Sequence, residues 1–277
     1  SVKEEDLIQN LYVLSSHVQI LCFTTKGKVF WLKVYEIPVA SRTSKGRPLV
    51  NMLNLDDDER VSEILPVEEF SDKYFIFMAT RKGITKKTNL SLFARKWKSG
   101  IKAINLDDDD KLIGTAITDG SQEILLASSA GKLIRFKESK VRAMGRTARG
   151  VKGIKLKKDQ RLISLNVADS TKKVLCVSEN GYGKKTELDD FPTHNRGGQG
   201  VISIKTSERN GLMVAATLVE EDDGIMLISD KGTMIRTNVS QIPTLSRNTQ
   251  GVKVITPKEG EKLMECVTIP TEEDQNE

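Results

Sequence analysis

Lysine and arginine recur at a fixed offset from five glycines of this sequence. These glycines each end an apolar stretch, and we refer to them as the turn glycines: Gly27, Gly83, Gly131, Gly181 and Gly232. In four copies the fourth residue after the glycine is cationic, and two of these copies carry a further lysine directly before it. The first copy has Trp31 there and a lysine two places later. The cations are Lys33, Lys86, Lys87, Arg135, Lys184, Lys185 and Arg236. Regularly spaced cations of this kind can bind phosphate groups.

A second cationic group precedes or touches another glycine in each copy. We call these the second glycines: Gly46, Gly100, Gly150, Gly200 and Gly251. The cations near them are Arg42, Lys45, Arg95, Lys96, Lys98, Arg142, Arg146, Arg149, Arg196 and Arg247. Exposed outer strands often carry such residues for solubility and edge protection. That explains single cations, but not one offset filled in four of five copies while acidic runs at 56–59 and 107–110 avoid it. We therefore predict that both groups bind the phosphates of duplex DNA.

The residues needed for catalysis or metal binding form no recognisable pattern. The two histidines, His17 and His194, lack the spacing of metal ligands, and no G-x-S-x-G nucleophile motif is present. The acidic runs consist of consecutive residues, which is typical of solvated turns rather than of a facing carboxylate pair. We expect no catalytic residue, no metal site and no cofactor in this chain. Aromatic residues make up only 5% of it, which argues against a module that stacks single-stranded nucleic acid.

Short strands must position the cations, because each repeat alternates apolar runs with turn residues. The third repeat predicts strands at 101–106, 111–117, 124–127 and 132–136, with an Asp119-Gly120 turn between the second and third. Four strands in about fifty residues are the content of one blade, and a repeat of this length is typical of a β-propeller. The predicted fold is all-β, a six-bladed propeller or pinwheel whose outer strands carry a positive belt.

The repeats also predict the domain boundaries. We place them at 1–50, 51–100, 101–150, 151–200 and 201–251, followed by a partial repeat at 252–270 and an acidic disordered tail at 271–277. The partial repeat has only two strands, so the first or last blade is expected to be incomplete and the chain to be a piece of a longer protein. No apolar run reaches the length of a membrane span, and no signal-peptide pattern opens the chain. Three cysteines without C-x-x-C spacing (Cys22, Cys176 and Cys266) are expected to be buried thiols in a reducing cytosol.

Several separate segments, in one order along nearly the whole chain, resemble the C-terminal domains of DNA gyrase A subunits. They include Lys45-Gly-Arg-Pro-Leu-Val-Asn51, Phe136-Lys-Glu-Ser-Lys-Val-Arg-Ala-Met144, Glu179-Asn-Gly-Tyr-Gly-Lys-Lys185, Glu208-Arg-Asn-Gly-Leu212 and Gly232-Thr-Met-Ile-Arg236. The resemblance implies a six-bladed propeller that bends duplex DNA around a basic rim, so that the holoenzyme introduces negative supercoils. It also implies that the catalytic tyrosine lies in an earlier domain and that the ATPase is the separate B subunit.

The resemblance further implies a set of partners. They are duplex DNA, the rest of the gyrase A subunit, and the ATPase B subunit, in an A2B2 complex that uses ATP and Mg in the bacterial cytoplasm, associated with the nucleoid. The family's basic box, Q-R-R-G-G-R/K-G, on which wrapping depends, would lie directly before Val2 and is not in this sequence; His194-Asn-Arg-Gly-Gly-Gln-Gly200 is a degenerate copy of it. Binding is expected without the box, whereas full wrapping is open.

Two alternatives to this interpretation stay open. The related C-terminal domain of the topoisomerase IV A subunit would sense DNA geometry. A protein-interaction propeller would need no cationic belt, although the sequence lacks the WD signature of many such domains.

Overall fold

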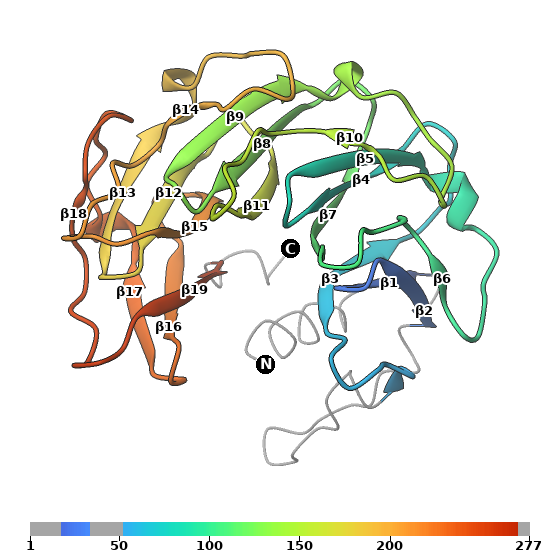
Figure 1. Cartoon of the computed structure of the whole chain (residues 1–277), viewed down its shortest axis with the longest axis horizontal. Helices are drawn as coiled ribbons and strands as arrows, with labels where there is room; N and C mark the ends of the chain where they lie inside the picture. Colours follow the sequence, from blue (N-terminus) through green and yellow to red (C-terminus); the bar gives the residue numbers. More distant parts are fainter. Residues whose placement is uncertain (1–17, 34–51, 271–277) are drawn as a thin grey trace. The chain divides into compact units, whose positions relative to one another are not determined.

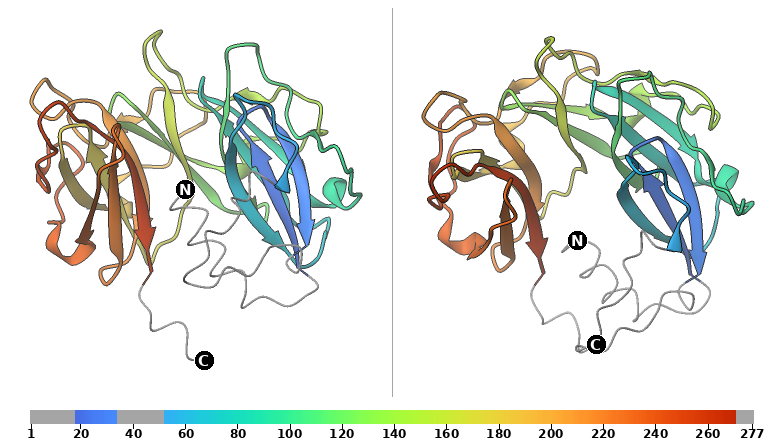
Figure 2. Two further views of the ribbon diagram at one scale, coloured as in Figure 1. Left: turned by 90° about the horizontal axis from the view of Figure 1, so that it is seen from below. Right: turned by 60° about the horizontal axis from the view of Figure 1, so that its bottom comes forward.

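The computed structural model describes residues 18–33 and 52–270. They form two compact units, which we describe separately. The first contains the described residues up to Ser121 together with Val141–Lys152, and the second contains Gln122–Lys140 and the described residues from Gly153 onward. The strands of both units can be followed in Figure 1 and from two further sides in Figure 2. The predicted tail at 271–277 and the cations Arg42 and Lys45 lie outside the described residues.

The first unit contains two four-stranded antiparallel sheets, with strand orders β3-β1-β2-β6 and β10-β5-β4-β7. Its strands are β1 (Gln19–Thr24), β2 (Lys28–Lys33), β3 (Val61–Val67), β4 (Phe75–Thr80), β5 (Ile84–Asn89), β6 (Ile101–Lys102), β7 (Leu112–Thr118) and β10 (Val151–Lys152). A 3-10 turn, η3 (Leu90–Phe93), follows β5.

The second unit contains three sheets, with orders β11-β8-β9-β14, β15-β12-β13-β18 and β17-β16-β19. Its strands are β8 (Glu123–Ser128), β9 (Lys132–Lys137), β11 (Leu162–Val167), β12 (Lys173–Ser178), β13 (Tyr182–Glu187), β14 (Val201–Ile202), β15 (Met213–Val219), β16 (Gly224–Ser229), β17 (Met234–Asn238), β18 (Val252–Lys253) and β19 (Leu263–Ile269). The 3-10 turns are η4 (Glu138–Lys140), η5 (Leu188–Asp190) and η6 (Val239–Gln241).

Each sheet is built around a hairpin that the sequence predicted correctly. In β4 and β5, the apolar run ends at Thr80, Gly83 takes a φ of 89°, and the Gly83 N–H donates to the Thr80 carbonyl at 2.9 Å. A positive φ is easily reached by glycine alone, which explains the turn glycines. The apolar strand has side chains buried on both faces, as expected of a strand in the middle of a packed sheet.

The assignment of four consecutive strands to one blade is wrong, because neighbouring repeats exchange strands. The β4–β5 hairpin takes β7 on one side and β10 on the other, although β8 and β9 intervene between these two strands in the sequence. The second glycines allow the short outer strands to approach the hairpins closely enough to pair with them. A Cβ on Gly150 would lie 2.3 Å from the Thr85 carbonyl oxygen, and one on Gly200 would lie 2.5 Å from that of Leu133.

The predicted all-β propeller is confirmed, but the predicted number of six blades is wrong. The described residues form five sheets. The two strands that the sequence assigned to a partial sixth repeat complete other sheets instead: β18 pairs with β13, and β19 pairs with β16. Both join hairpins from earlier in the chain, because the outer positions of each sheet are filled by later strands.

The cores of both units lie between the apolar hairpin strands. In the first unit, Phe23 and Phe93 pack edge to face with ring centroids 6.1 Å apart. Fully buried side chains of this size each contribute roughly 1.5–3 kcal/mol to folding. Cys22 and Cys176 are buried thiols as predicted, whereas the Cys266 thiol is half-buried. Among the described residues, no helix has both the length and the apolar character that crossing a membrane requires.

Candidate nucleic-acid interface

Four loops that lead to the second glycines carry exposed or half-buried cations. We call them the cationic loops: residues 94–100, 141–150, 191–200 and 243–251. Each has a cation four residues before its second glycine, namely Lys96, Arg146, Arg196 and Arg247. Lys96 is exposed, and the three arginines are half-buried.

In the first unit, loop 94–100 presents three exposed cations, Arg95, Lys96 and Lys98. The Arg95 guanidinium lies over the ring of Trp97, 4.4 Å from its centroid, and the Trp97 side chain is 39% exposed. The sequence analysis missed this aromatic, because the low aromatic content of the whole chain does not show where a single aromatic residue lies among cations. The loop can offer both charge and a flat apolar surface to a nucleic acid.

Loop 141–150, also in the first unit, is fixed along β5. The Met144 N–H donates to the Lys87 carbonyl at 2.7 Å, and Lys87 and Ala143 form a parallel bridge. Arg142 and Arg149 are exposed, and Arg149 forms an ion pair with Asp107 in which both side chains stay largely exposed. Such exposed pairs contribute little energy and can exchange Asp107 for a phosphate.

The loops of the second unit follow their hairpins in the same way. His194 N–H donates to the Arg135 carbonyl at 2.8 Å, and Leu245 N–H donates to the Lys185 carbonyl at 2.8 Å. Two loop arginines also bind backbone: Arg196 Nε donates to the Lys140 carbonyl at 3.1 Å, and Arg247 Nη1 donates to the Ile202 carbonyl at 3.1 Å. Loops 141–150, 191–200 and 243–251 are therefore positioned by the hairpins.

Among the cations four residues after a turn glycine, only Arg236 is exposed in the described residues. Lys87 and Lys185 are 6% and 3% exposed, so their predicted place on the surface is corrected. The Lys87 ammonium lies 4.8 Å from the centroid of the Phe75 ring, and Lys185 binds both carboxylate oxygens of Glu221 at 2.7 and 2.8 Å. These side chains anchor structure rather than face solvent.

Arg135 occupies the same position and is half-buried. Its Nε donates to Glu123 Oε2 at 2.9 Å and its Nη2 donates to Oε1 at 3.1 Å, while Nη1 reaches the carbonyls of Leu188 and Phe191. The hydrogen bond from Arg135 holds the pKa of Glu123 below its usual value. Lys33, at the end of β2, is also half-buried.

Lys86 and Lys184 are fully buried, which corrects their prediction as surface charges. Burial, reinforced by the charge of Arg146, lowers the pKa of Lys86 to about 7, and burial lowers the pKa of Lys184 to about 8. A side chain enclosed in this way cannot reach a phosphate on the surface.

Sequence reasoning also missed a set of exposed lysines on the outermost strands. Lys102, Lys152 and Lys253 each lie two residues after a second glycine and end the short strands β6, β10 and β18. The same periodicity that identified the loop cations could have found them. They add positive charge beside the cationic loops.

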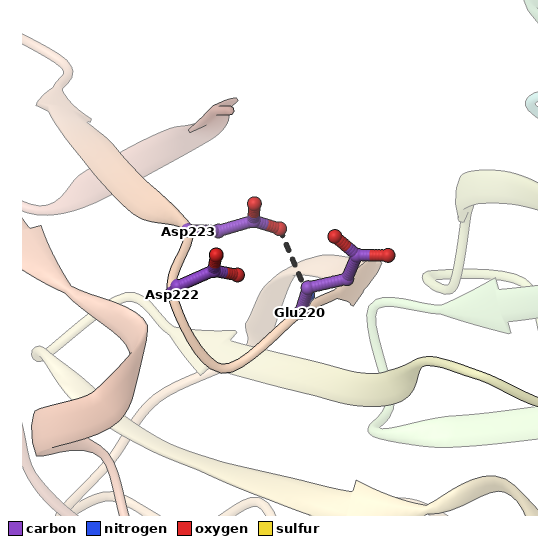
Figure 3. A group of neighbouring side chains, drawn as sticks. All are labelled: Glu220, Asp222 and Asp223. Carbon is purple, nitrogen blue, oxygen red and sulfur yellow. Dashed lines mark hydrogen bonds between the residues drawn. The ribbon is translucent and has the colours of Figure 1, made fainter. Parts of the chain in front are cut away.

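Three carboxylates gather at the turn between β15 and β16, from Glu220, Asp222 and Asp223 (Figure 3). Their oxygens lie within 4.8 Å of one another, as metal ligands could. Asp223 Oδ2, however, accepts a hydrogen bond from the Glu220 N–H at 2.8 Å. Binding the backbone of a turn in this way is a common structural role of aspartate and explains Asp223 without a metal ion.

Comparison with known proteins gives this arrangement a family context. The chain is 49% identical over 263 residues to the DNA gyrase A subunit of Salmonella typhimurium, and 47% identical over 275 residues to that of Escherichia coli K12. These matches cover 95% and 99% of the chain but only 30% and 31% of the relatives. The chain therefore spans less than a third of the length of these relatives.

Two solved structures share the fold. A C-terminal domain of DNA topoisomerase IV matches with a TM-score of 0.85 and 26% identity, over 92% of this chain and 80% of that one. A DNA gyrase A C-terminal domain matches with a TM-score of 0.77 and 25% identity, over 93% and 84%. The family described as the DNA gyrase C-terminal domain, a β-propeller, matches residues 19–68, 74–119, 122–169, 172–220 and 225–269. Each of these five segments contains one hairpin together with described strands that follow it in the sequence, and the chain belongs to this DNA gyrase C-terminal domain family.

Proposed function

We propose that this chain is the DNA-wrapping domain of a DNA gyrase A subunit. Its cationic loops bind the phosphates of duplex DNA and bend it, so that strand passage by the rest of the enzyme introduces negative supercoils. The observation that carries this proposal is the cation four residues before the second glycine in each of the four cationic loops, three of which are anchored to hairpins, in a chain closely related to gyrase A subunits.

Phosphate contacts of this kind predict strong salt dependence and little sequence preference. Each neutralised phosphate releases counterions, so the logarithm of the binding constant falls with the logarithm of salt concentration by about 0.9 per contact. Bending a short DNA site smoothly by 40–90° costs roughly 1–6 kcal/mol, which several loops acting together can offset. Backbone contacts carry no direct base information.

The chemistry of supercoiling belongs, in this proposal, to other parts of the enzyme. The chain acts as a non-catalytic domain that binds no cofactor itself, within an A2B2 complex whose B subunit is the ATPase and which uses ATP and Mg. The complex works on the nucleoid in the bacterial cytoplasm.

A second candidate is the sensing of DNA geometry in topoisomerase IV. The higher TM-score of the topoisomerase IV domain, 0.85 against 0.77, supports it. The greater sequence identity to gyrase A subunits favours wrapping. The two functions differ in whether the bound DNA changes its linking number.

Ligation of nicked circular plasmid in the presence of the chain separates these functions. After the protein is removed, gyrase-type wrapping leaves topoisomers shifted toward positive linking difference, in proportion to the protein added. Binding without a shift favours the second candidate. No binding at low salt would refute both.

A matched pair of variants tests the interface itself. Arg142→Glu with Arg149→Glu reverses two exposed loop charges and is expected to abolish the shift. Lys26→Glu changes the charge of a turn lysine paired with Asp56 and Asp58 and is expected to preserve it. Equal effects of both changes would contradict the assignment of the loops. If the chain were instead a protein-interaction propeller, neither change should affect the binding of its protein partner.

A further inference from the structure

Two lysines occupy a position that is otherwise apolar. The third residue after the turn glycine is Phe30, Ile134 or Ile235 in three hairpins, and Lys86 or Lys184 in the other two. Both lysines are 0% exposed. Enclosing an ammonium group is unfavourable unless hydrogen-bond acceptors replace its water. The acceptors therefore indicate what the lysines do.

Lys184 converges on one cationic loop. Its Nζ lies 2.8 Å from the Ser246 carbonyl oxygen, 2.6 Å from that of Arg247 and 3.1 Å from that of Thr249, with Thr249 Oγ1 at 2.9 Å. All four acceptors belong to loop 243–251. An ammonium has three donors and no acceptor, so it suits a nest of oxygens of this kind.

Lys86 does the same in the first unit. Its Nζ donates to the Arg146 carbonyl at 2.5 Å and to the Ala103 carbonyl at 2.6 Å. Arg146 and Arg247 stand at the same place in their loops, four residues before the second glycine. In both units the buried ammonium therefore holds the peptide of the very arginine that the proposed function assigns to DNA.

We propose that Lys86 and Lys184 are positioning residues of the DNA interface, which hold Arg146 and Arg247 in place by binding the backbone of their loops. This inference rests on the proposed function. A loop that is already ordered loses little conformational freedom when DNA binds, whereas an unheld loop must be ordered at that moment. Loss of either lysine is expected to weaken DNA binding on the order of tenfold.

Loop 191–200 provides an internal comparison. Its hairpin carries Ile134 at the lysine position, and Ile134 Cδ1 lies 3.8 Å from where a Cβ of Gly198 would be. The loop is held by backbone bonds instead, from Gly197 N–H to the Gly153 carbonyl at 2.7 Å and from Lys155 N–H to the Gly198 carbonyl at 2.8 Å. The fold thus accepts an apolar residue at this position, and replacing the lysines by methionine is expected to preserve folding.

Protonation provides a second readout. The pKa of Lys86, lowered by burial and by Arg146, is about 7. The pKa of Lys184 is lowered to about 8 chiefly by burial, with the charges of Arg247 and Lys205 acting in the same direction and that of Asp190 against it. A neutral amine has one donor fewer than an ammonium, and the hydrogen bonds that it donates are weaker because they are no longer charge-assisted. The loops should loosen, and DNA affinity should fall, as the pH rises from about 6.5 to 9.

The test measures the dissociation constant of the whole chain for a linear DNA duplex, at both pH values. Lys86→Met is expected to weaken binding about tenfold at pH 6.5 and to flatten the pH profile, with thermal unfolding showing an intact fold. In a background that lacks all three arginines of loop 141–150 (Arg142→Ala, Arg146→Ala and Arg149→Ala) it should change affinity less than about twofold, because the cations that the held loop presents are gone. Lys184→Met paired with Arg247→Ala repeats the test in the second unit, and Lys26→Met is the matched loss of a surface charge.

Unchanged affinity in a folded Lys86→Met chain, or an equal loss with and without the three arginines of loop 141–150, would overturn the inference. If a methionine variant does not fold, the pH profile of the unmodified chain decides: a flat profile overturns it, and a fall toward pH 9 supports it. An unmodified chain that does not bind DNA at all would instead refute the proposed function.

Discussion

Substitution of Gly150 by alanine should be the most damaging single-methyl change in the first unit's cationic loop 141–150. Gly150 has a φ of 97°, and an added Cβ would lie 2.3 Å from the Thr85 carbonyl oxygen and 3.1 Å from Lys86 Cβ. A left-handed conformation costs a residue with a Cβ roughly 1–2 kcal/mol. The overlap with backbone must also move β10 away from β5, where Val151 pairs with Thr85, at about 1 kcal/mol for each lost hydrogen bond. We expect a loss of about 3 kcal/mol in the free energy of unfolding.

Gly145, five residues earlier in the same loop, provides the control. Its φ is not in the left-handed region, and nothing lies within 4 Å of a Cβ added there. Gly145→Ala should change stability by less than about 1 kcal/mol, and in the stabilising direction, because alanine reduces the freedom of the unfolded chain. Urea unfolding of both variants, followed by circular dichroism, measures the difference. Two variants of equal stability would refute the account of the second glycines as the residues that admit the outer strand.

Three further predictions concern charge. The pKa of Lys86 falls from 10.5 in the unfolded chain to about 7 in the folded one, so the unfolded state binds more protons between these pH values. The free energy of unfolding should therefore rise with pH across that window, by about 2 kcal/mol from pH 7 to 9. Urea unfolding of Lys86→Met should lack this rise, and parallel pH profiles of the two chains would contradict the prediction. The hydrogen bond from Arg135 lowers the pKa of Glu123, so the stability that this pair adds is present above the usual pKa of 4.5 and is lost as the pH falls below it. Glu123→Gln should destabilise the fold by about 1–2 kcal/mol at pH 7 and should remove this acid dependence from thermal unfolding. Arg142→Ala should reduce the salt slope of DNA binding by about 0.9, while Lys26→Ala leaves it unchanged; equal slopes in titrations over salt would remove Arg142 from the interface.

The sequence alone determined the hairpins, because their information is local. An apolar run followed by a glycine with positive φ and a second run specifies a tight turn between two strands wherever it occurs. The periodicity of these hairpins identified the all-β class. Loop cations such as Arg142 and Arg149 were also found correctly as exposed residues, since a loop between strands usually lies at the surface.

The tertiary structure decided which strands share a sheet, and with that the number of sheets. Strand exchange depends on pairing between residues far apart in the chain, such as Gly183 with Val252, and no local pattern marks the partner. The strands after Gly251 therefore looked like a sixth repeat, although β18 and β19 complete the fourth and fifth sheets.

The structure also decided which cations are available to DNA. Both Lys86 and Lys87 were predicted to bind DNA, although successive residues of a strand point to opposite faces. Both are buried: the Lys86 ammonium binds the Ala103 and Arg146 carbonyls, and the Lys87 ammonium lies over the Phe75 ring. The sequence does not distinguish a lysine whose ammonium is in water from one whose ammonium binds backbone oxygens. Only the packing of a loop some sixty residues further along the chain separates an exposed phosphate contact from a buried lysine that holds the loop.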